Sequence, residues 1–384
     1  MGYVAQSAVC VFLPLLFTIF NRFYNISLIK LTFLTTVNFT AQLAIDFLSM
    51  FFVSKIGYRK CAVLAHIMIT VGFLTLGIFA AAAENTYAVI FGSVVLFSIG
   101  GGLLEVLINP IVESCPSDNK AASMSILHSM YAFGSIIVVL VSALFLNTFG
   151  KENWQILCLI MAAVPVINTI AFLMVPIAPI EDEERLSLSG IIKSRVFLLC
   201  SLLMFAGGAA EVSMSQWSSA FAESTLGISK ALGDILGPCM FAAMLAAARV
   251  VYPIVSKKVK LRYYMVACSV LCIGVYLVAA LTPYKYMALI CCGLCGFLVG
   301  IFWPGTISLA VGTSGGGSVA MFALLALAGD LGCTAGPTLV GSVASAFNGD
   351  LRAGLLTATV FPVIMLIGLF LFIKMKNAVK LNKA

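Results

Sequence analysis

Long apolar runs separated by short polar turns dominate the chain. A membrane-spanning helix needs about 20 predominantly apolar residues, and twelve runs reach that length, so the pattern predicts twelve transmembrane helices. The fold class that follows is an all-α membrane protein. The predicted spans cover residues 2–20, 30–54, 61–83, 87–112, 121–149, 154–178, 195–221, 230–255, 263–282, 286–311, 319–347 and 355–373.

The longest polar break falls between the sixth and seventh runs. It reads "APIEDEERLSLSGIIKSR" over 178–195, first acidic and then basic. This break predicts an N-terminal six-helix bundle over 1–178, a cytoplasmic linker over 179–194, and a C-terminal six-helix bundle with a short basic tail over 195–384.

The two halves repeat each other. When 26–55 is placed over 228–257 without a gap, Ile-Ser coincides at the start and Val-Ser-Lys at the end. Asn109-Pro110 in the fourth span is echoed by Trp303-Pro304 in the tenth. Parallel six-helix repeats are typical of transporters that bind substrate near the bilayer midplane, between the two halves.

Composition supports the membrane assignment. Hydrophobic residues make up 62% of the chain and charged residues 10%, with a mean hydropathy of +1.12. The net charge of +7 resides in short loops, which argues against a nucleic-acid partner. The first run has no basic segment before it and is expected to stay as a transmembrane helix. The twelve cysteines lie mostly within apolar runs, and we expect no metal, no cofactor and a monomer in the lipid bilayer.

Lysine and arginine orient the helices, because loops on the cytoplasmic side carry more of them. Fifteen lie on one side and six on the other, so both termini and the linker are predicted to be cytoplasmic, in a plasma membrane of the bacterial inner-membrane type. The first set is Lys55, Arg59, Lys60, Lys120, Arg185, Lys193, Arg195, Lys257, Lys258, Lys260, Arg262, Lys374, Lys376, Lys380 and Lys383; the second is Arg22, Lys30, Lys151, Lys230, Lys285 and Arg352.

Ionisable residues inside spans are functional candidates, because a charge at mid-bilayer costs roughly 3 kcal/mol on insertion scales. Glu105 and His128 each lie about 10 Å from the cytoplasmic ends of adjacent antiparallel spans, which predicts a hydrogen bond between them. For Arg249, a structural ion pair and a substrate contact are equally plausible roles. For Asp46, a structural role is favoured. The residues of this kind are Asp46, Glu105, His128, Glu211, Arg249 and Asp330.

Uncharged polar and aromatic residues are expected to face the same cavity. Aromatic faces beside amide donors suit sugars and other neutral polyols, and they suit flat drugs almost as well. These residues are Gln6, Asn38, Gln42, Gln216, Trp217 and Trp303. In the fourth span, Pro110 removes a backbone donor, and Asn109 could satisfy freed backbone groups or bind a ligand hydroxyl.

The basic turn after the second span resembles the cytoplasmic signature of the major facilitator superfamily. Lys55, Gly57 and the pair Arg59-Lys60 match it, while Ser54 replaces the family's Asp. The resemblance implies a major facilitator fold and a structural or gating role for these residues. We expect the same kind of role for Asp46, Arg249 and Pro110, from their positions within the spans.

The stretch "GGGLLEVLINPIVESCPSDNKAASMSILHSMYAFG" (100–134) is similar to the fucose permease branch of that superfamily. The match is Gly-x-x-x-Glu-x-x-x-Asn-Pro followed by Phe-Gly, and it implies that Glu105 takes part in proton-coupled uptake. The branch's first-span Asp aligns with Cys10, and its sugar-contacting Asn aligns with Tyr131. These two departures favour a substrate other than fucose.

The sequence therefore predicts a secondary active transporter, a symporter that moves a small polar, sugar-like solute and protons by alternating access. Glu105 is the leading protonation or ligand site. Efflux of amphipathic drugs or metabolites is the alternative within transport, and a non-transporting membrane receptor is the alternative outside it. No catalytic constellation is present, so an enzyme is not expected.

Overall fold

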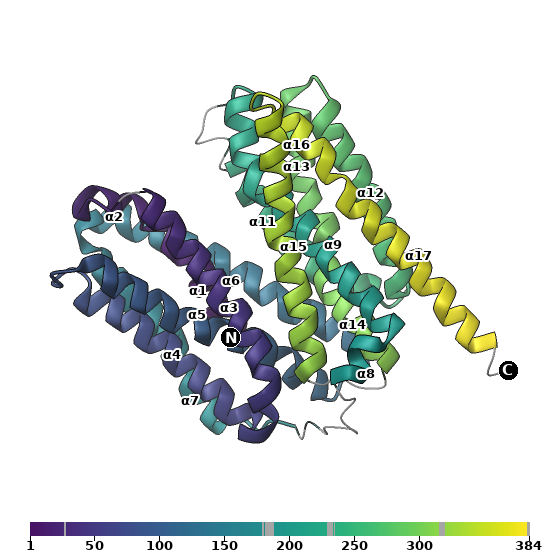
Figure 1. Ribbon diagram of the computed structural model, residues 1–384, viewed down its shortest axis with the longest axis horizontal. Helices are drawn as coiled ribbons and strands as arrows, with labels where there is room; N and C mark the ends of the chain where they lie inside the picture. The colour runs from purple at the N-terminus through teal and green to yellow at the C-terminus, as the bar shows by residue number, and fades with distance from the viewer. Residues whose placement is uncertain are drawn as a thin grey trace. The chain divides into compact units, whose positions relative to one another are not determined.

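The computed structural model describes residues 1–26, 28–178, 180, 188–228, 233, 235–314 and 319–381. Within these ranges the chain is helical and contains no strand (Figure 1). Eleven helical segments of the described chain are long and apolar enough to cross a membrane. The all-α membrane fold is therefore confirmed, and the full count of twelve spans stays a prediction.

Two compact units make up the chain. Unit 1 consists of Met1–Pro116 and Met130–Asp182, and unit 2 of Ser117–Ser129 and Glu183–Ala384. The helix α6 (Lys120–Phe149) thus contributes its first turns to unit 2 and the remainder to unit 1. The predicted linker lies partly outside the described residues, and α8 (Leu188–Lys193) is its described helix. The expected division into two six-helix halves stays a prediction.

Unit 1 is built around α5, which packs against α1, α3 and α4, while α4 also packs against α7. The helices of this unit, besides the later part of α6, are α1 (Gly2–Leu15), α2 (Phe17–Tyr24), α3 (Leu28–Ile56), α4 (Tyr58–Phe79), α5 (Thr86–Ser114), the 3-10 turn η1 (Lys151–Asn153) and α7 (Trp154–Met174).

The first predicted span is broken rather than continuous. Pro14 cannot donate to the carbonyl of Cys10, and the helix tightens at Leu16, whose N–H bonds to Leu13 O at 3.0 Å. The chain resumes as α2, so the first span is two short helices that extend to Tyr24 instead of one helix that ends near residue 20.

Unit 2 is built around α9 and α13. α9 packs against α14, α15 and α17, and α13 packs against α11 and α12 (Figure 1). Its helices, besides α8 and the first turns of α6, are α9 (Arg195–Ala220), the π-helical turns η2 (Phe221–Thr225) and η3 (Ile235–Cys239), α11 (Met240–Val255), α12 (Leu261–Leu281), α13 (Lys285–Val299), α14 (Phe302–Ser314), α15 (Val319–Ala346), α16 (Leu351–Ala358) and α17 (Val360–Leu381).

Two further predicted spans are interrupted at prolines. The tenth span is α13 followed by α14, and the break falls just before Pro304, which cannot donate to the carbonyl of Gly300. The twelfth span is α16 followed by α17, and the break at Thr359 precedes Pro362 in the same way. Both spans keep membrane length across the interruption, from Lys285 to Thr313 and from Leu351 to Met375.

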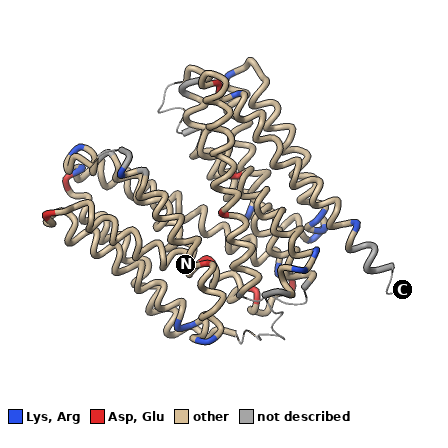
Figure 2. The backbone as a smooth tube through the Cα atoms, in the orientation of Figure 1, with Lys and Arg blue, Asp and Glu red and all other residues tan. Residues whose placement is uncertain are grey.

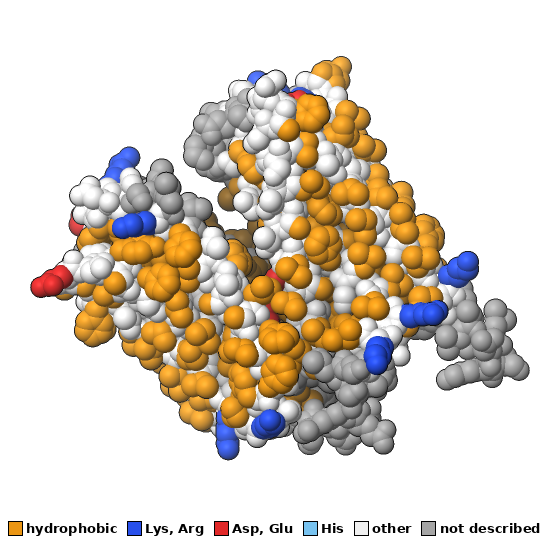
Figure 3. Space-filling model, viewed as in Figure 1, with side chains coloured by type: hydrophobic (Ala, Val, Ile, Leu, Met, Phe, Trp, Pro, Cys, Tyr) orange, Lys and Arg blue, Asp and Glu red, His pale blue; other side chains and the backbone are white. Residues whose placement is uncertain are grey.

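On the surface of each unit, charged and hydrophobic side chains are distributed as expected of a membrane protein. Lysine and arginine gather at turns and helix ends, and the helix interiors carry few charges (Figure 2). Hydrophobic side chains cover much of the visible outer face of each unit (Figure 3). On α3, for example, Phe39 and Phe51 are about half exposed, which suits a lipid-facing surface.

Three consecutive glycines let α5 approach three helices. A Cβ at Gly100 would lie 2.5 Å from a backbone oxygen of α4, and one at Gly101 would lie 2.8 Å from a side chain of α1. One at Gly102 would lie 2.8 Å from the Cα of Gln42 on α3. Since small residues allow close helix approach in membranes, this triad sets the packing around the polar residues of α5.

We expect Gly102→Ala to destabilise the protein, because the new methyl group would meet backbone atoms of α3. Overpacking of this kind costs about 1–3 kcal/mol. Gly92→Ala on the same helix is the matched control, since a Cβ there meets nothing within 4 Å. Thermal unfolding in detergent should show a lower midpoint for Gly102→Ala only. Equal midpoints for the two variants would contradict the packing role of the triad.

Candidate functional site

On the C-terminal side of the glycine triad, side chains of α5 take part in a chain of hydrogen bonds. Gln6 Nε2 of α1 donates to Glu105 Oε2 at 2.5 Å. Asn109 Nδ2 donates to the backbone carbonyl of Glu105 at 3.0 Å, and Tyr3 Oη donates to Asn109 Oδ1 at 3.0 Å. Two residues of α1 therefore fix the carboxylate and the amide of α5.

A second set of contacts links α1, α3 and α5. Gln42 Nε2 donates to Asn38 Oδ1 at 3.1 Å, and Ser98 Oγ of α5 donates to the same oxygen at 2.6 Å. Cys10 Sγ of α1 lies 3.7 Å from Gln42 Oε1. Asn38 and Gln42 are both almost fully buried, so their amides are satisfied by protein groups.

These side chains form two hydrogen-bonded sets on the same three helices of unit 1, and we describe them together as the unit 1 network. Each of the three helices contributes residues at helical spacing, so the polar positions form one stripe per helix. The unit 1 network comprises Tyr3, Gln6 and Cys10 of α1, Asn38 and Gln42 of α3, and Ser98, Glu105 and Asn109 of α5. Tyr3 and Ser98 were not predicted as site residues from the sequence. Each lies on the same stripe as a predicted site residue, Tyr3 with Gln6 and Ser98 with Glu105.

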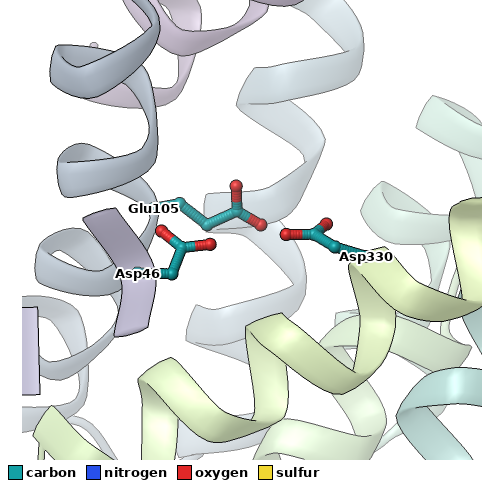
Figure 4. Close-up of side chains that lie close together, drawn as sticks. All are labelled: Asp46, Glu105 and Asp330. Atoms are coloured by element: carbon teal, nitrogen blue, oxygen red, sulfur yellow. The ribbon is translucent and has the colours of Figure 1, made fainter. Parts of the chain in front are cut away.

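Asp46 lies beside the network. It is fully buried on α3, one turn beyond Gln42, and its side chain points toward that of Glu105 (Figure 4). A carboxylate oxygen of each lies within 4.8 Å of the other. Asp330, also labelled in the figure, belongs to α15 of unit 2. Unit 1 thus holds a pair of neighbouring acidic side chains.

Tyr131 and Pro110 flank the network. The ring of Tyr131 meets that of Tyr3 edge to face, with centroids 6.5 Å apart. Pro110 is buried within α5 and does not end the helix, which continues to Ser114. Next to it, Asn109 bonds the carbonyl of Glu105 and the hydroxyl of Tyr3. The carbonyl that Pro110 leaves without its helical donor is that of Val106, so Asn109 does not compensate for the proline.

A second polar cluster lies in unit 2 around Arg249 of α11. Its guanidinium is 4% exposed and makes three contacts. Nη2 lies 3.5 Å from Glu211 Oε2 on α9, Nε donates to the carbonyl of Gly300 at 3.0 Å, and Nη1 donates to the carbonyl of His128 at 3.0 Å. Of the two roles expected for Arg249, the ion pair is therefore present, with Glu211 as the partner.

Prolines supply acceptors to this cluster. Pro304 cannot bond the carbonyl four residues earlier, that of Gly300, and Arg249 Nε takes it instead. Pro253 likewise leaves the carbonyl of Arg249, and Ser125 Oγ donates to it at 2.7 Å. Backbone groups freed inside a membrane need partners from the protein, so the two prolines explain why Arg249 and Ser125 are anchored here.

The remaining predicted residues of unit 2 have different surroundings. Trp303 packs its ring onto Gly329 of α15, next to Asp330, and Gln216 is exposed on α9. The imidazole of His128 is buried. Because Glu105 belongs to unit 1 and His128 to unit 2, their expected hydrogen bond stays a prediction.

The basic turn between α3 and α4 contacts the end of α7. Gly57 joins the two helices with a φ of +96°, a conformation that favours glycine. Arg59 Nη1 donates to the carbonyls of Phe172 and Leu173 at 2.8 and 3.1 Å, at the end of α7. A cation at a helix C-terminus is favourable. Lys55 and Lys60 are exposed in the same turn.

Membrane-length helices that enclose hydrogen-bonding side chains define a multi-pass membrane protein of the transporter class. A family model described as the Major Facilitator Superfamily matches residues 1–337. The chain belongs to that superfamily, which confirms the family that the sequence resembles, and it is a transporter rather than an enzyme.

Solved structures agree with this assignment. The fucose:proton symporter FucP of E. coli, as its N162A variant, has a TM-score of 0.80 at 14% identity, over 97% of each chain. The proton:xylose symporter XylE gives 0.79 at 11% identity, over 97% of this chain and 93% of that one. The human organic anion transporter MFSD10 gives 0.72 at 13% identity, over 96% of each. No curated protein sequence matches the chain.

We expect Arg249→Gln to destabilise the protein, because it leaves Glu211 and two backbone carbonyls without their partner. Residues in direct contact typically show coupling of about 0.5–3 kcal/mol. A double-mutant cycle with Glu211→Gln, read from denaturant unfolding in detergent, should reveal that coupling. Strictly additive effects would contradict the ion pair as a stabilising contact.

Proposed function

We propose that the protein is a secondary active transporter for a small neutral polar solute, sugar-like in chemistry, and that it couples transport to protons through Glu105. Alternating access would involve twelve spans in two six-helix bundles, with both termini cytoplasmic. The observation that carries the proposal is the unit 1 network, since a membrane helix bundle has little other use for so many buried hydrogen-bonding groups.

The chemistry of the network supports a polyhydroxylated solute. Its amides and hydroxyls each offer donors and acceptors, and they bond one another in the structure. A sugar hydroxyl also donates and accepts, so it can replace such internal bonds one for one. The network includes the carboxylate of Glu105 but no lysine or arginine. It therefore has no cation to bind an anionic solute, which disfavours solutes of that kind. Asn38, Gln42, Asn109 and Tyr131 are the proposed solute contacts in this unit.

The neighbouring acids support proton coupling. Two full negative charges 4.8 Å apart would repel by about 3 kcal/mol at an effective dielectric constant of 20. A proton shared between Asp46 and Glu105 would remove this repulsion, which supports the pair as the proposed coupling site. Gln6 bonds the carboxylate of Glu105 directly, so a solute that competes for Gln6 would change how strongly Glu105 holds that proton.

The structural relatives support the same interpretation. FucP and XylE are named as symporters of a sugar and a proton. In this chain Cys10 occupies the position that the branch's first-span Asp would take, and Asp46 supplies a second acid from α3 instead. We propose Glu211, Gln216, Trp303, Asp330 and His128 as further contacts contributed by unit 2.

A binding screen tests the solute class. Purified protein should gain thermal stability with sugars or related polyols, and nucleosides, amino acids and amphipathic drugs complete the panel. Gln6→Ala should weaken binding of the best sugar about tenfold. The reason is that a sugar that competes for Gln6 would lose one hydrogen bond to it. Gln155→Ala on α7, outside the network, should leave it unchanged. Stabilisation by amphipathic drugs alone would favour efflux instead.

Neutralising Glu105 tests the coupling. In proteoliposomes, Glu105→Gln should abolish accumulation driven by a pH gradient while leaving solute exchange at equal concentrations intact, because the amide can still bond Gln6 but cannot release a proton. Glu84→Gln, an exposed acid outside the network, is the control and should behave like the unmodified protein. Gradient-driven accumulation that survives in Glu105→Gln would remove Glu105 from the coupling role.

A further inference from the structure

A cavity of about 560 Å³ lies in unit 2, and its lining includes no residue of the Arg249 cluster. It is open to the surroundings and is formed where α12 ends and α16 begins. Its apolar side includes Leu281 and Leu356, and its polar side includes Thr282, Asp350 and Arg352. The transport proposal uses none of these residues.

The cavity lies at the ends of two membrane-length segments. The segment that contains α12 ends at Leu281, and the segment that contains α16 begins at Leu351. Tyr284 and Tyr286, on the adjoining turn, are 71% and 55% exposed. Exposed tyrosines at the ends of spanning helices are typical of the boundary between hydrocarbon and headgroups. A lipid molecule beside the protein would therefore place its headgroup at this cavity.

Arg352 supplies a cation whose position is fixed. Its Nη1 donates to the carbonyls of Ala280 and Thr282 at 3.0 and 2.7 Å, which ties the guanidinium to the end of α12. The face of Phe221 lies 5.8 Å from the guanidinium carbon. Among the described residues, Nε and Nη2 have no hydrogen-bond acceptor, so these donors are available to a ligand.

Asp350 supplies an anion in the same cavity. It is exposed, and its Oδ1 caps α16 by accepting from the N–H of Arg352 at 2.9 Å. The second carboxylate oxygen can accept from a ligand. The cavity thus presents one fixed cation and one anion. Its apolar wall continues along Leu281, which is 64% exposed.

We propose that this cavity binds the headgroup of a phospholipid that carries both a phosphate and a primary amine. The phosphate bonds Nε and Nη2 of Arg352, since a guanidinium suits phosphate geometry. The ammonium group bonds Asp350, and the acyl chains follow the apolar wall of α12 and α16. An anionic headgroup without an amine would meet the carboxylate of Asp350 unfavourably. The orientation proposed above places the lipid in the outer leaflet.

Lipid retention by purified protein tests the proposal. Delipidated protein in mild detergent is mixed with phosphatidylethanolamine or with phosphatidylglycerol, and bound lipid is counted by native mass spectrometry. The unmodified protein should retain more phosphatidylethanolamine. Arg352→Gln should reduce retention of both lipids about tenfold, as expected for the loss of a charge-assisted contact. Lys285→Gln, a cation at the same level outside the cavity lining, should change nothing.

Asp350→Asn separates recognition from stability, because asparagine preserves the helix cap while removing the charge. It should bind phosphatidylethanolamine and phosphatidylglycerol equally, and this result stands even if Arg352→Gln fails to fold. Equal retention by the unmodified protein and both cavity variants would overturn the proposal, as would a preference of the unmodified protein for phosphatidylglycerol. Displacement of the lipid by equimolar soluble glycerophosphoethanolamine would contradict a lipid as the ligand.

Discussion

Polar atoms inside a bilayer must find partners within the protein, and this constraint accounts for the internal organisation of both units. Water is absent from the hydrocarbon region, so an amide, a carboxylate or a backbone carbonyl freed by proline needs a neighbour of its own. In unit 1 side chains bond one another, as Tyr3 bonds Asn109 and Ser98 bonds Asn38. In unit 2 the acceptors are largely backbone carbonyls, and Arg249 gathers them.

The two solutions suit different tasks. A network of side-chain amides and hydroxyls can exchange its internal bonds for bonds to a solute at small net cost, because each lost bond is replaced by a similar one. The Arg249 cluster binds carbonyls of fixed helices and one carboxylate, so it ties α6, α9, α11 and the break between α13 and α14 together. The first arrangement favours ligand binding, and the second favours a stable helix assembly.

Sequence patterns anticipated much of this organisation. The apolar runs predict the helices of the described chain, and the ionisable residues within spans include Glu105, Asp46 and Arg249, which lie in the polar clusters of the structure. Three features depended on tertiary structure. The break at Leu16 needed the local geometry after Pro14, the Gln6–Glu105 bond needed the close approach of α1 to α5 through Gly101, and the pairing of Arg249 with Glu211 needed the packing of α9 and α11. Equal depth in the membrane suggests which residues can meet, but rotation of each helix decides which do.

We propose that the carboxyl group of Glu105 exchanges a proton as the neighbouring network exchanges its hydrogen bonds for a solute. The most direct test follows pH in a weakly buffered suspension of proteoliposomes when a stabilising sugar is added outside, with no gradient imposed. We expect the sugar to draw protons inward and make the external medium more alkaline, in proportion to the sugar taken up. Sugar uptake without any accompanying movement of protons would contradict the central claim.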